Sequence, residues 1–486
     1  MSEQTRLKTG ALGAAGISFL VVGAAAPLTV MTGVTPLAIA IGGVGAPLGY
    51  LAAGVVLAVF AVGYTAMTRH TRGAGAFYSY ITLGLGRPLG AASGMLAVFS
   101  YNALQIGVYG LLGVQFAAAC ARFTGAEVPW WVFAVATVAL VWALGRRGID
   151  VGAWVVGVLL VAESAILLLL VVAVLTRARL TGGTFTADAL SGPGMPAILG
   201  FCFAAFMGFE STALYRAEAR QPDRTIPRAT YAAVAFLAVF YGVVAWAVVQ
   251  AFGDAEVVAA AAANPTALLF TAMEKYAGGW AADIMYVLVL TSILAAQLSF
   301  HNAINRYAFN LAHDGLLPAA LGHSHPRFRS PAVAGATQSV LAVVVVACFA
   351  LAGADPIRQL LILVNTPGVL GVLMLLALTS VAVLAYFLRR RGVPGARVAT
   401  ASSALGAVLL TLVFGVIIDK VGLLTNAAPD VDVALVAVVP MVLAAGLVWA
   451  LIRKAGNPRA YARIGGEEAG RMGAAVAPAA ALEVTA

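Results

Sequence analysis

Apolar runs of about 20 residues, separated by short polar loops, follow one another along most of the chain. A run of this length crosses a bilayer as an α-helix, because the hydrocarbon core is about 30 Å thick. The pattern predicts an all-α polytopic membrane protein with about twelve transmembrane helices. Their expected bounds are 13–41, 47–68, 88–122, 129–145, 151–176, 196–215, 228–252, 279–311, 331–353, 357–388, 398–419 and 432–453.

Two shorter segments are also predicted to be helical. Residues 76–86, between the second and third spans, are expected to form an amphipathic helix at the membrane interface. Asn264-Pro265 opens another short helix that reaches about Tyr276, because proline suits the first turn of a helix. In the tenth span, residues 365–368 (Asn-Thr-Pro-Gly) predict a local break.

Composition agrees with a membrane protein. The chain is 62% hydrophobic and 10% charged, whereas soluble proteins carry about 25% charged residues. The net charge of +9 does not indicate a nucleic-acid partner, because the basic residues lie in short loops. Their bias toward alternate loops predicts a multi-pass protein of the plasma (inner) membrane with both termini cytoplasmic. Only six of the 29 Lys and Arg residues fall in loops that this topology places outside: Arg122, Arg177, Arg179, Lys275, Arg358 and Lys420.

Two spans contain residues that interrupt helices. The first has Gly23, Pro27 and Gly33, and the sixth has Gly200 and Gly208. They are five spans apart, an odd number, so two units of five spans would have opposite orientations. Interrupted helices at matching positions of inverted halves indicate a transporter site, although Gly and Pro are also common in ordinary membrane helices.

The predicted organisation is therefore a 5+5 inverted repeat with broken helices 1 and 6, followed by two C-terminal helices. The expected parts are a cytoplasmic N-terminus (1–12), a first repeat (13–176), a second, inverted repeat (196–388), helices 11 and 12 (398–453) and a disordered cytoplasmic tail (455–486).

Glu210 is the most informative single residue, because it lies inside the apolar stretch 198–214. A carboxylate at that depth costs about 3 kcal/mol or more. Burial disfavours the charged form, so we expect Glu210 to bind and release a coupling proton or to hold a substrate ammonium. The alternative is a permanently protonated glutamate that hydrogen-bonds the loosened backbone.

The third span carries a polar and aromatic stripe. Tyr101, Gln105 and Tyr109 recur every four residues and share one helix face, and Asn102 flanks them. Aromatic faces attract cations and amides orient polar groups, so the stripe suits an amine or amino-acid pocket. Hydrogen bonding between helices explains such residues equally well.

Neighbouring residues complete the candidate site. Phe206 and Phe209 are candidates for stacking on the ligand or gating it, with core packing as the alternative. Thr29 is a candidate ligand or an ordinary hydroxyl bonded to its own helix. Sodium is the alternative coupling ion, because carbonyls of the first span and hydroxyls such as Ser292 or Ser299 could line an ion site.

Three segments resemble the amino acid–polyamine–organocation (APC) superfamily, and in particular its actinobacterial-type amino acid and amine permeases. Residues 203–230 are similar to the sixth-helix signature, an aromatic-rich F-x-G-[FV]-E followed by acidic residues and P-x-R-x-[IV]-P. Residues 299–318 are similar to the eighth-helix ending, S-x-x-N-x-x-x-R followed by D-G-x-x-P. Residues 73–80 weakly resemble P-x-G-G-x-Y-x-Y.

The resemblance covers about residues 11–453 and implies the same inverted-repeat fold. It implies secondary active transport of amino acids, amines or related small organic ions, with the substrate between helices 1, 3, 6, 8 and 10. Arg306 and Asp314 belong to the matched motif, which implies an inner-gate or loop-ordering pair.

The chain departs from the family pattern at two places. Most amino-acid carriers of the family have a G-[SA]-G stretch in helix 1 whose amides bind the substrate carboxylate. Here Ala25 and Pro27 occupy this substrate-binding stretch, and proline offers no N–H. Several relatives carry a lysine in helix 5, where this chain has Glu163, a second candidate for the coupling group.

The sequence thus predicts a permease that moves amino acids or related amines and polyamines by alternating access with proton coupling. An exchanger (antiporter) of the same family is one alternative, and a membrane sensor or channel on the same scaffold is another. Neither a P-loop nor an H-E-x-x-H motif is present, so we expect no enzyme activity, cofactor or metal. The expected partners are a small-molecule substrate and the lipid bilayer.

Overall fold

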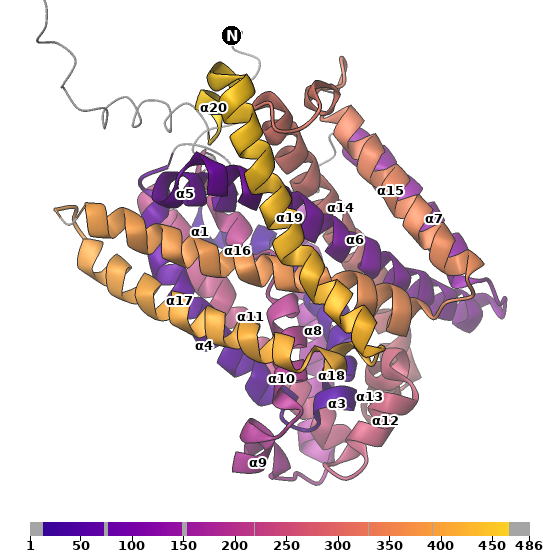
Figure 1. Cartoon of the computed structure of the whole chain (residues 1–486). Coiled ribbons are helices and arrows are strands. Elements are labelled where there is room, and N and C mark those ends of the chain that lie inside the picture. Colours follow the sequence, from indigo (N-terminus) through magenta and orange to yellow (C-terminus); the bar gives the residue numbers. More distant parts are fainter. Residues whose placement is uncertain are drawn as a thin grey trace, which may run out of the picture.

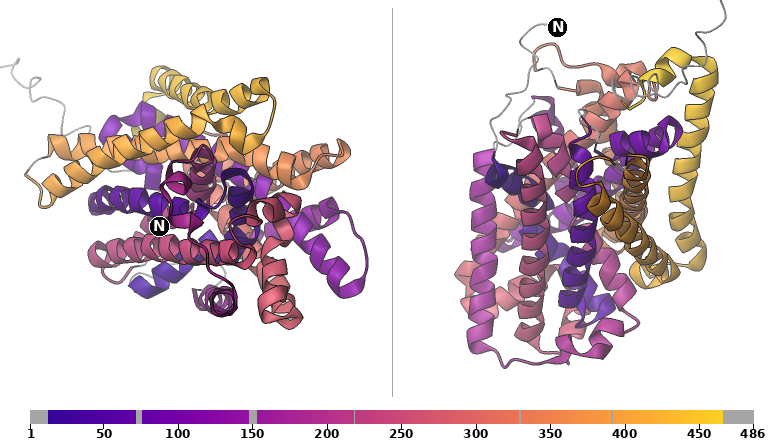
Figure 2. Two further views of the ribbon diagram at one scale, coloured as in Figure 1. Left: turned by 90° about the horizontal axis from the view of Figure 1, so that it is seen from below. Right: turned by 90° about the vertical axis from the view of Figure 1, so that its left-hand side faces the viewer.

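The computed structural model describes residues 13–71, 76–147, 153–217, 219–328, 330–390 and 392–465. Helices are the regular elements of these residues, and they pack side by side in one bundle (Figures 1 and 2). Eleven of them are long and apolar enough to cross a membrane, or up to twelve if one bent pair counts as a span. The predicted all-α polytopic fold is confirmed.

The helices, in chain order, are α1 (Ala14–Ala25), α2 (Pro27–Thr29), the π-helix η2 (Val30–Val34), α3 (Thr35–Gly42), α4 (Ala46–Thr68), α5 (Ala76–Leu85), α6 (Arg87–Thr124), α7 (Trp130–Arg146), α8 (Ala153–Arg177), η3 (Gly183–Phe185), α9 (Ala187–Ser191), α10 (Met195–Ala205), η4 (Phe209–Ala217), α11 (Pro222–Phe252), α12 (Val257–Ala263), η5 (Pro265–Ala267), α13 (Leu268–Ala277), α14 (Gly279–His313), η6 (Ala319–Gly322), α15 (Ala332–Leu351), the π-helix η7 (Pro356–Leu361), α16 (Ile362–Arg389), α17 (Ala396–Asp419), α18 (Val421–Thr425), α19 (Pro429–Gly456) and α20 (Pro458–Arg463).

The fourth predicted span corresponds to α7, which has 17 residues and is slightly shorter than the eleven long helices. The bent pair consists of α12 and the segment Pro265–Ala277, which meet at an angle of 109°. They lie at one end of the bundle, opposite α5 and α20 (Figure 1). The short helix that Asn264-Pro265 was expected to open is therefore present.

Both predicted helix breaks are confirmed. In the first span, α1 ends at Ala25, Ala26 has the left-handed backbone angle φ 47°, and Pro27 starts the next helical segment. In the sixth span, α10 ends at Ala205, and Gly208 with φ 111° precedes the 3₁₀-helix η4. Glycine reaches positive φ without strain, which lets the chain change direction there. The inverted relation between the two halves stays a prediction.

Glycines let α6 and α16 approach each other closely. A Cβ atom on Gly368 of α16 would lie 2.9 Å from the carbonyl oxygen of Ser100 in α6, and one on Gly110 of α6 would lie 2.5 Å from that of Pro356 in η7, which leads into α16. Small residues at helix contacts allow backbones to pack closely in a membrane, where the hydrophobic effect adds little between helices. The long helix α6 is thereby fixed against its neighbour at the centre of the bundle.

The segment predicted as an interfacial helix, 76–86, forms the helix α5. Phe77, Tyr78, Tyr80 and Ile81 are all buried. Helix α5 packs against α6 and α16. Its position at the membrane interface stays a prediction.

The predicted break in the tenth span is wrong. Helix α16 runs without interruption from Ile362 to Arg389 with Pro367 inside it, and the irregular π-helix η7 comes earlier. The side chain of Thr366 donates to the carbonyl of Ile362 at 2.8 Å, while the Asn365 amide can donate to two carbonyls of α6. Such side-chain bonds and local π turns are what allow proline inside membrane helices.

The contact between α19 and α6 gives a test of this packing. A Cβ atom on Gly446 would lie 2.7 Å from the Cα of Ala92, a backbone atom that cannot move aside. We expect Gly446→Ala to separate the helices and lower the free energy of unfolding by about 1–3 kcal/mol. The measurement is the thermal unfolding midpoint of purified protein in detergent. Gly415→Ala is the matched control, because an added Cβ there meets nothing within 4 Å. Equal unfolding midpoints for Gly446→Ala and Gly415→Ala would contradict the close contact between α19 and α6.

Candidate functional site

The two helix breaks lie next to each other inside the bundle. A Cβ atom built on Gly208 would lie 3.8 Å from the Cβ of Ala24 and 3.8 Å from the backbone nitrogen of Ala25. The interrupted stretches of the first and sixth spans are therefore direct neighbours, and the side chains around them form one site.

Glu210 follows the break of the sixth span directly and is 3% exposed. One carboxyl oxygen accepts the backbone N–H of Gly208 at 2.9 Å, and the other accepts the hydroxyl of Tyr101. Its backbone carbonyl accepts the hydroxyl of Tyr64 at 2.7 Å. Glu210 thus holds the break in place and connects it to α6 and α4.

Glu163 plays the corresponding part at the break of the first span. It lies on α8, is 4% exposed, and accepts the hydroxyl of Ser292 at 2.9 Å and the backbone N–H of Leu28 at 3.4 Å. Leu28 offers the first N–H after Pro27. A carboxylate is favourable at the N-terminal end of a helical segment, where backbone N–H groups lack partners. Glu163 therefore points into the interior rather than toward the membrane interface.

Two further hydroxyls support the first break. Thr29 donates to the hydroxyl oxygen of Ser292 at 3.0 Å, so it joins the network of Glu163. Tyr241 donates to the carbonyl of Ala25, a group that the break leaves without its usual helical partner, at 3.3 Å. Of the predicted residues in this stretch, Thr29 contributes a side chain, Ala25 a carbonyl and Pro27 the break itself.

The predicted stripe of the third span serves two different purposes. Tyr101 reaches Glu210, but Gln105 donates to the backbone carbonyl of Gln297 on α14 at 3.2 Å. Gln297 donates in return to the carbonyl of Gln105 at 3.0 Å. Tyr109 lies 3.4 Å from the Gln105 amide, and Asn102 donates to its own helix at Val98. Beyond Tyr101 in the sequence, the stripe therefore joins α6 to α14 through Gln105.

Phe206 and Phe209 are both buried. The ring of Phe206 lies edge-on to Tyr241 with centroids 6.1 Å apart, and the ring of Phe209 lies edge-on to Phe60 at 5.9 Å. Edge-to-face pairs at these distances stabilise aromatic packing. In this conformation the two rings line the break of the sixth span through core contacts.

The two motif residues at the end of α14 lie apart from this site. Arg306 is exposed, and Asp314 accepts hydrogen bonds from the Tyr78 hydroxyl and from the backbone N–H of Gly465, the latter at 3.4 Å. The pairing of Arg306 with Asp314 stays a prediction.

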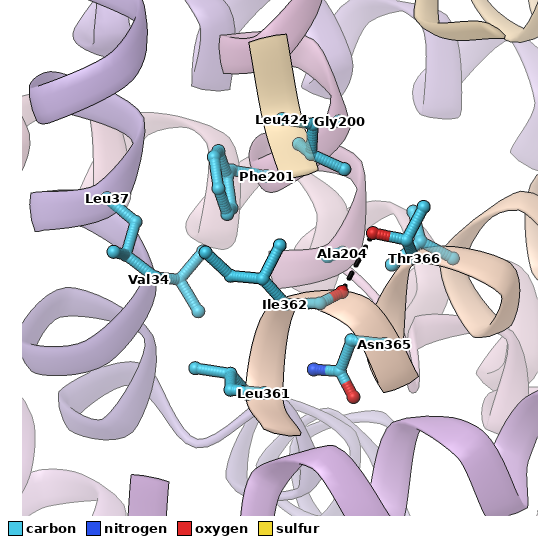
Figure 3. A pocket seen from close by; sticks show the side chains of 11 residues that line it. Val34, Leu37, Gly200, Phe201, Ala204, Leu361, Ile362, Asn365, Thr366 and Leu424 are labelled. Atoms are coloured by element: carbon cyan, nitrogen blue, oxygen red, sulfur yellow. Dashed lines mark hydrogen bonds between the residues drawn. The ribbon is translucent and has the colours of Figure 1, made fainter. Parts of the chain in front are cut away.

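A small cavity of about 50 Å³ lies beside the breaks (Figure 3). Its walls come from η2 and α3, from α10, and from η7 and α16, with one residue of α18. The lining is mostly apolar, and neither Glu163 nor Glu210 belongs to it: Val34, Leu37, Gly200, Phe201, Ala204, Leu361, Ile362, Asn365, Thr366, Val369 and Leu424. The cavity therefore contains neither acid, and we base the site on the hydrogen-bonded residues.

Comparison with known proteins assigns the chain to a family. The sequence model of a family described as amino acid permease matches residues 12–445. The chain belongs to the amino acid permease family. This confirms the APC resemblance and a family of permeases, not enzymes.

Several named relatives are similar to parts of this permease. An uncharacterized transporter of Mycobacterium bovis is 30% identical over 218 residues, which is 43% of this chain and 48% of the relative. The low-affinity putrescine importer PlaP of Escherichia coli is 24% identical over 303 residues, 59% of this chain and 64% of the relative. The lysine-specific permease LysP of Lactococcus lactis is 26% identical over 225 residues, 41% of this chain and 43% of the relative. The alignment spans about half the length of the first of these relatives.

Several residues of the candidate site carry no signal in the sequence. Tyr64 and Tyr241 each lie in an apolar span that contains one other tyrosine, Tyr50 and Tyr231 respectively, and no spacing or motif distinguishes them. Ser292 and Ser299 were named together as possible ion ligands. The structure separates them, because Ser292 is buried beside Glu163 whereas Ser299 is exposed.

This difference between two serines on one helix gives a matched test. Ser292→Ala removes the hydroxyl that donates to the buried Glu163 carboxyl group. We expect it to lower the free energy of unfolding by about 1–3 kcal/mol, because a buried acceptor loses its partner. Ser299→Ala should change it by no more than about 0.5 kcal/mol. The measurement is the thermal unfolding midpoint of both variants in detergent. Equal midpoints for Ser292→Ala and Ser299→Ala would contradict the proposed hydrogen-bond network of Glu163.

Proposed function

We propose that this permease is a secondary active transporter that carries a small amine or amino acid across the plasma membrane by alternating access, with a proton as the coupling ion. The observation that carries the proposal is the pair of buried acids at the two helix breaks. Each acid hydrogen-bonds a backbone N–H group next to a break, Glu163 to Leu28 and Glu210 to Gly208.

This arrangement links protonation to the geometry of the breaks. An ionised carboxyl group only accepts hydrogen bonds, and protonation turns one of its oxygens into a donor. Protonation of Glu163 would also remove the negative charge that stabilises the start of the second half of helix 1. Gaining or losing a proton at either acid therefore changes how firmly the adjoining half-helices are held, which is the requirement for coupling.

The names of the relatives support the transport class. They include an uncharacterized transporter, a putrescine importer and a lysine-specific permease. The expected cytoplasmic position of both termini belongs to the same proposal and is supported by the distribution of Lys and Arg residues.

The surroundings of the first break favour an amine over a zwitterionic amino acid. A substrate carboxylate would need free backbone N–H groups there. Pro27 has none, and the N–H of Leu28 already faces Glu163. The Glu210 carboxyl group and the ring of Tyr101 offer negative charge and an aromatic face, which suit an ammonium group. We therefore propose that the preferred substrate is a cationic amine.

The coupling role is tested with Glu210→Gln. Glutamine keeps the size of the side chain but cannot exchange the proton, so we expect uptake driven by an imposed pH gradient to fall to background in proteoliposomes. The thermal unfolding midpoint should show that the variant is folded. Glu256→Gln, at an exposed position outside the spans, is the control and should transport normally.

Three results would contradict the coupling proposal. Undiminished pH-driven uptake by Glu210→Gln would remove the coupling role of this residue. Uptake that requires a sodium gradient instead would indicate an ion site at Ser292 and Thr29. Flux that does not saturate and shows no counterflow would indicate a channel.

The substrate class is tested by ligand-induced stabilisation. A ligand at about 100 times its dissociation constant adds about 2.7 kcal/mol to the stability of the folded state. We expect putrescine and simple monoamines to raise the thermal unfolding midpoint more than leucine or alanine at equal concentration. Glu163→Gln removes the charge beside Leu28, so we expect the midpoint shifts caused by amines and by amino acids to become more similar in this variant. A larger shift with the zwitterionic amino acids in the unmodified permease would overturn the amine preference.

A further inference from the structure

The last described residues of the chain return to the bundle and bind it. After α19, the short helix α20 leads to Ile464, which is 1% exposed, and to Gly465. The backbone N–H of Gly465 lies 2.7 Å from the hydroxyl oxygen of Tyr78 and 3.4 Å from a carboxyl oxygen of Asp314. Figure 1 shows α20 at the same end of the bundle as α5. We call residues 458–465 the C-terminal strap.

The strap fits closely against α5. Gly465 has φ 90°, and a Cβ atom there would lie 2.5 Å from the side chain of Thr82. Only glycine combines this backbone angle with such a close approach. The strap also contacts the start of α6, because the guanidinium group of Arg87 lies 6.0 Å from the ring centre of Tyr461.

Tyr78 connects the strap to α14. Its hydroxyl donates to Asp314 and accepts from Gly465. Burial, together with the nearby Asp314 carboxylate, raises the pKa of Tyr78 well above its ordinary value. The hydroxyl therefore remains protonated and keeps donating to Asp314 over the physiological pH range.

Helix α5 lies between the strap and the acid at the sixth break. On α5, the ring of Tyr80 packs 5.0 Å from that of Tyr64, and the ring of Phe77 lies 6.4 Å from it. Tyr64 in turn donates to the backbone carbonyl of Glu210 at 2.7 Å. A continuous set of contacts therefore runs from Gly465 through α5 to the site.

We propose that the C-terminal strap is an autoinhibitory element that holds α5 against the aromatic residues beside Glu210 and so slows the opening of the site toward this end of the bundle. This inference rests on the proposed transport function. We expect opening at this end to move α5 away from Tyr64, and the bond between Gly465 and Tyr78 resists this movement. Release of the strap frees α5 and speeds the transport cycle.

The test is Gly465→Ala, which cannot keep both the backbone angle and the contact with Thr82. Tyr78→Phe is a second variant, which removes the hydroxyl and leaves the strap sequence intact. The matched control is Gly456→Ala at the end of α19, where an added Cβ meets nothing within 4 Å. Each full-length protein is measured for hydrogen exchange of the α5 amides without substrate and for initial uptake rate of putrescine in proteoliposomes.

We expect both strap variants to exchange the α5 amides severalfold faster and to transport severalfold faster than the control. Unchanged exchange in α5 would show that the strap does not hold this helix, and unchanged or slower uptake would show that the strap does not inhibit. If the unmodified permease takes up no putrescine, the proposed function and not the strap has failed the test, and the exchange of α5 then decides whether the strap holds this helix.

Discussion

Backbone groups that leave a helix inside a membrane must find partners within the protein, because the bilayer core has no water to offer. Both breaks of this permease create such groups. Glu163 accepts the N–H of Leu28, Glu210 accepts the N–H of Gly208, and Tyr241 donates to the carbonyl of Ala25. The rest of the site is arranged around these bonds.

The same constraint explains why two acids are tolerated in the interior. An unpaired carboxyl group would be costly at this depth, but each acid here has two donors. Ser292 and Leu28 both donate to Glu163, and Tyr101 and Gly208 both donate to Glu210. Because the donors come from different helices, each acid is also a point where the relative position of helices and the presence of a proton affect each other.

The sequence alone predicted what depends on local chemistry. Pro27 and Gly208 locate the breaks because their backbone preferences are strong, and Glu210 stands out because a charge is rare in an apolar run. It could not predict partners that come from distant spans, such as Tyr64 on α4. Nor could it predict that neighbouring helices bury Phe77 and Tyr80 of α5, because a ten-residue helix with small polar residues has the same pattern whether membrane headgroups or neighbouring helices cover it.

The mutual bonds of Gln105 and Gln297 have a consequence for how the permease moves. Each amide donates to the backbone carbonyl of the other residue, so both bonds depend on one relative register of α6 and α14. Sliding either helix by a single residue would break both bonds together and take from two buried side-chain amides the carbonyl acceptors that they now have. The pair therefore favours a single register of α6 and α14 and resists sliding of one helix past the other.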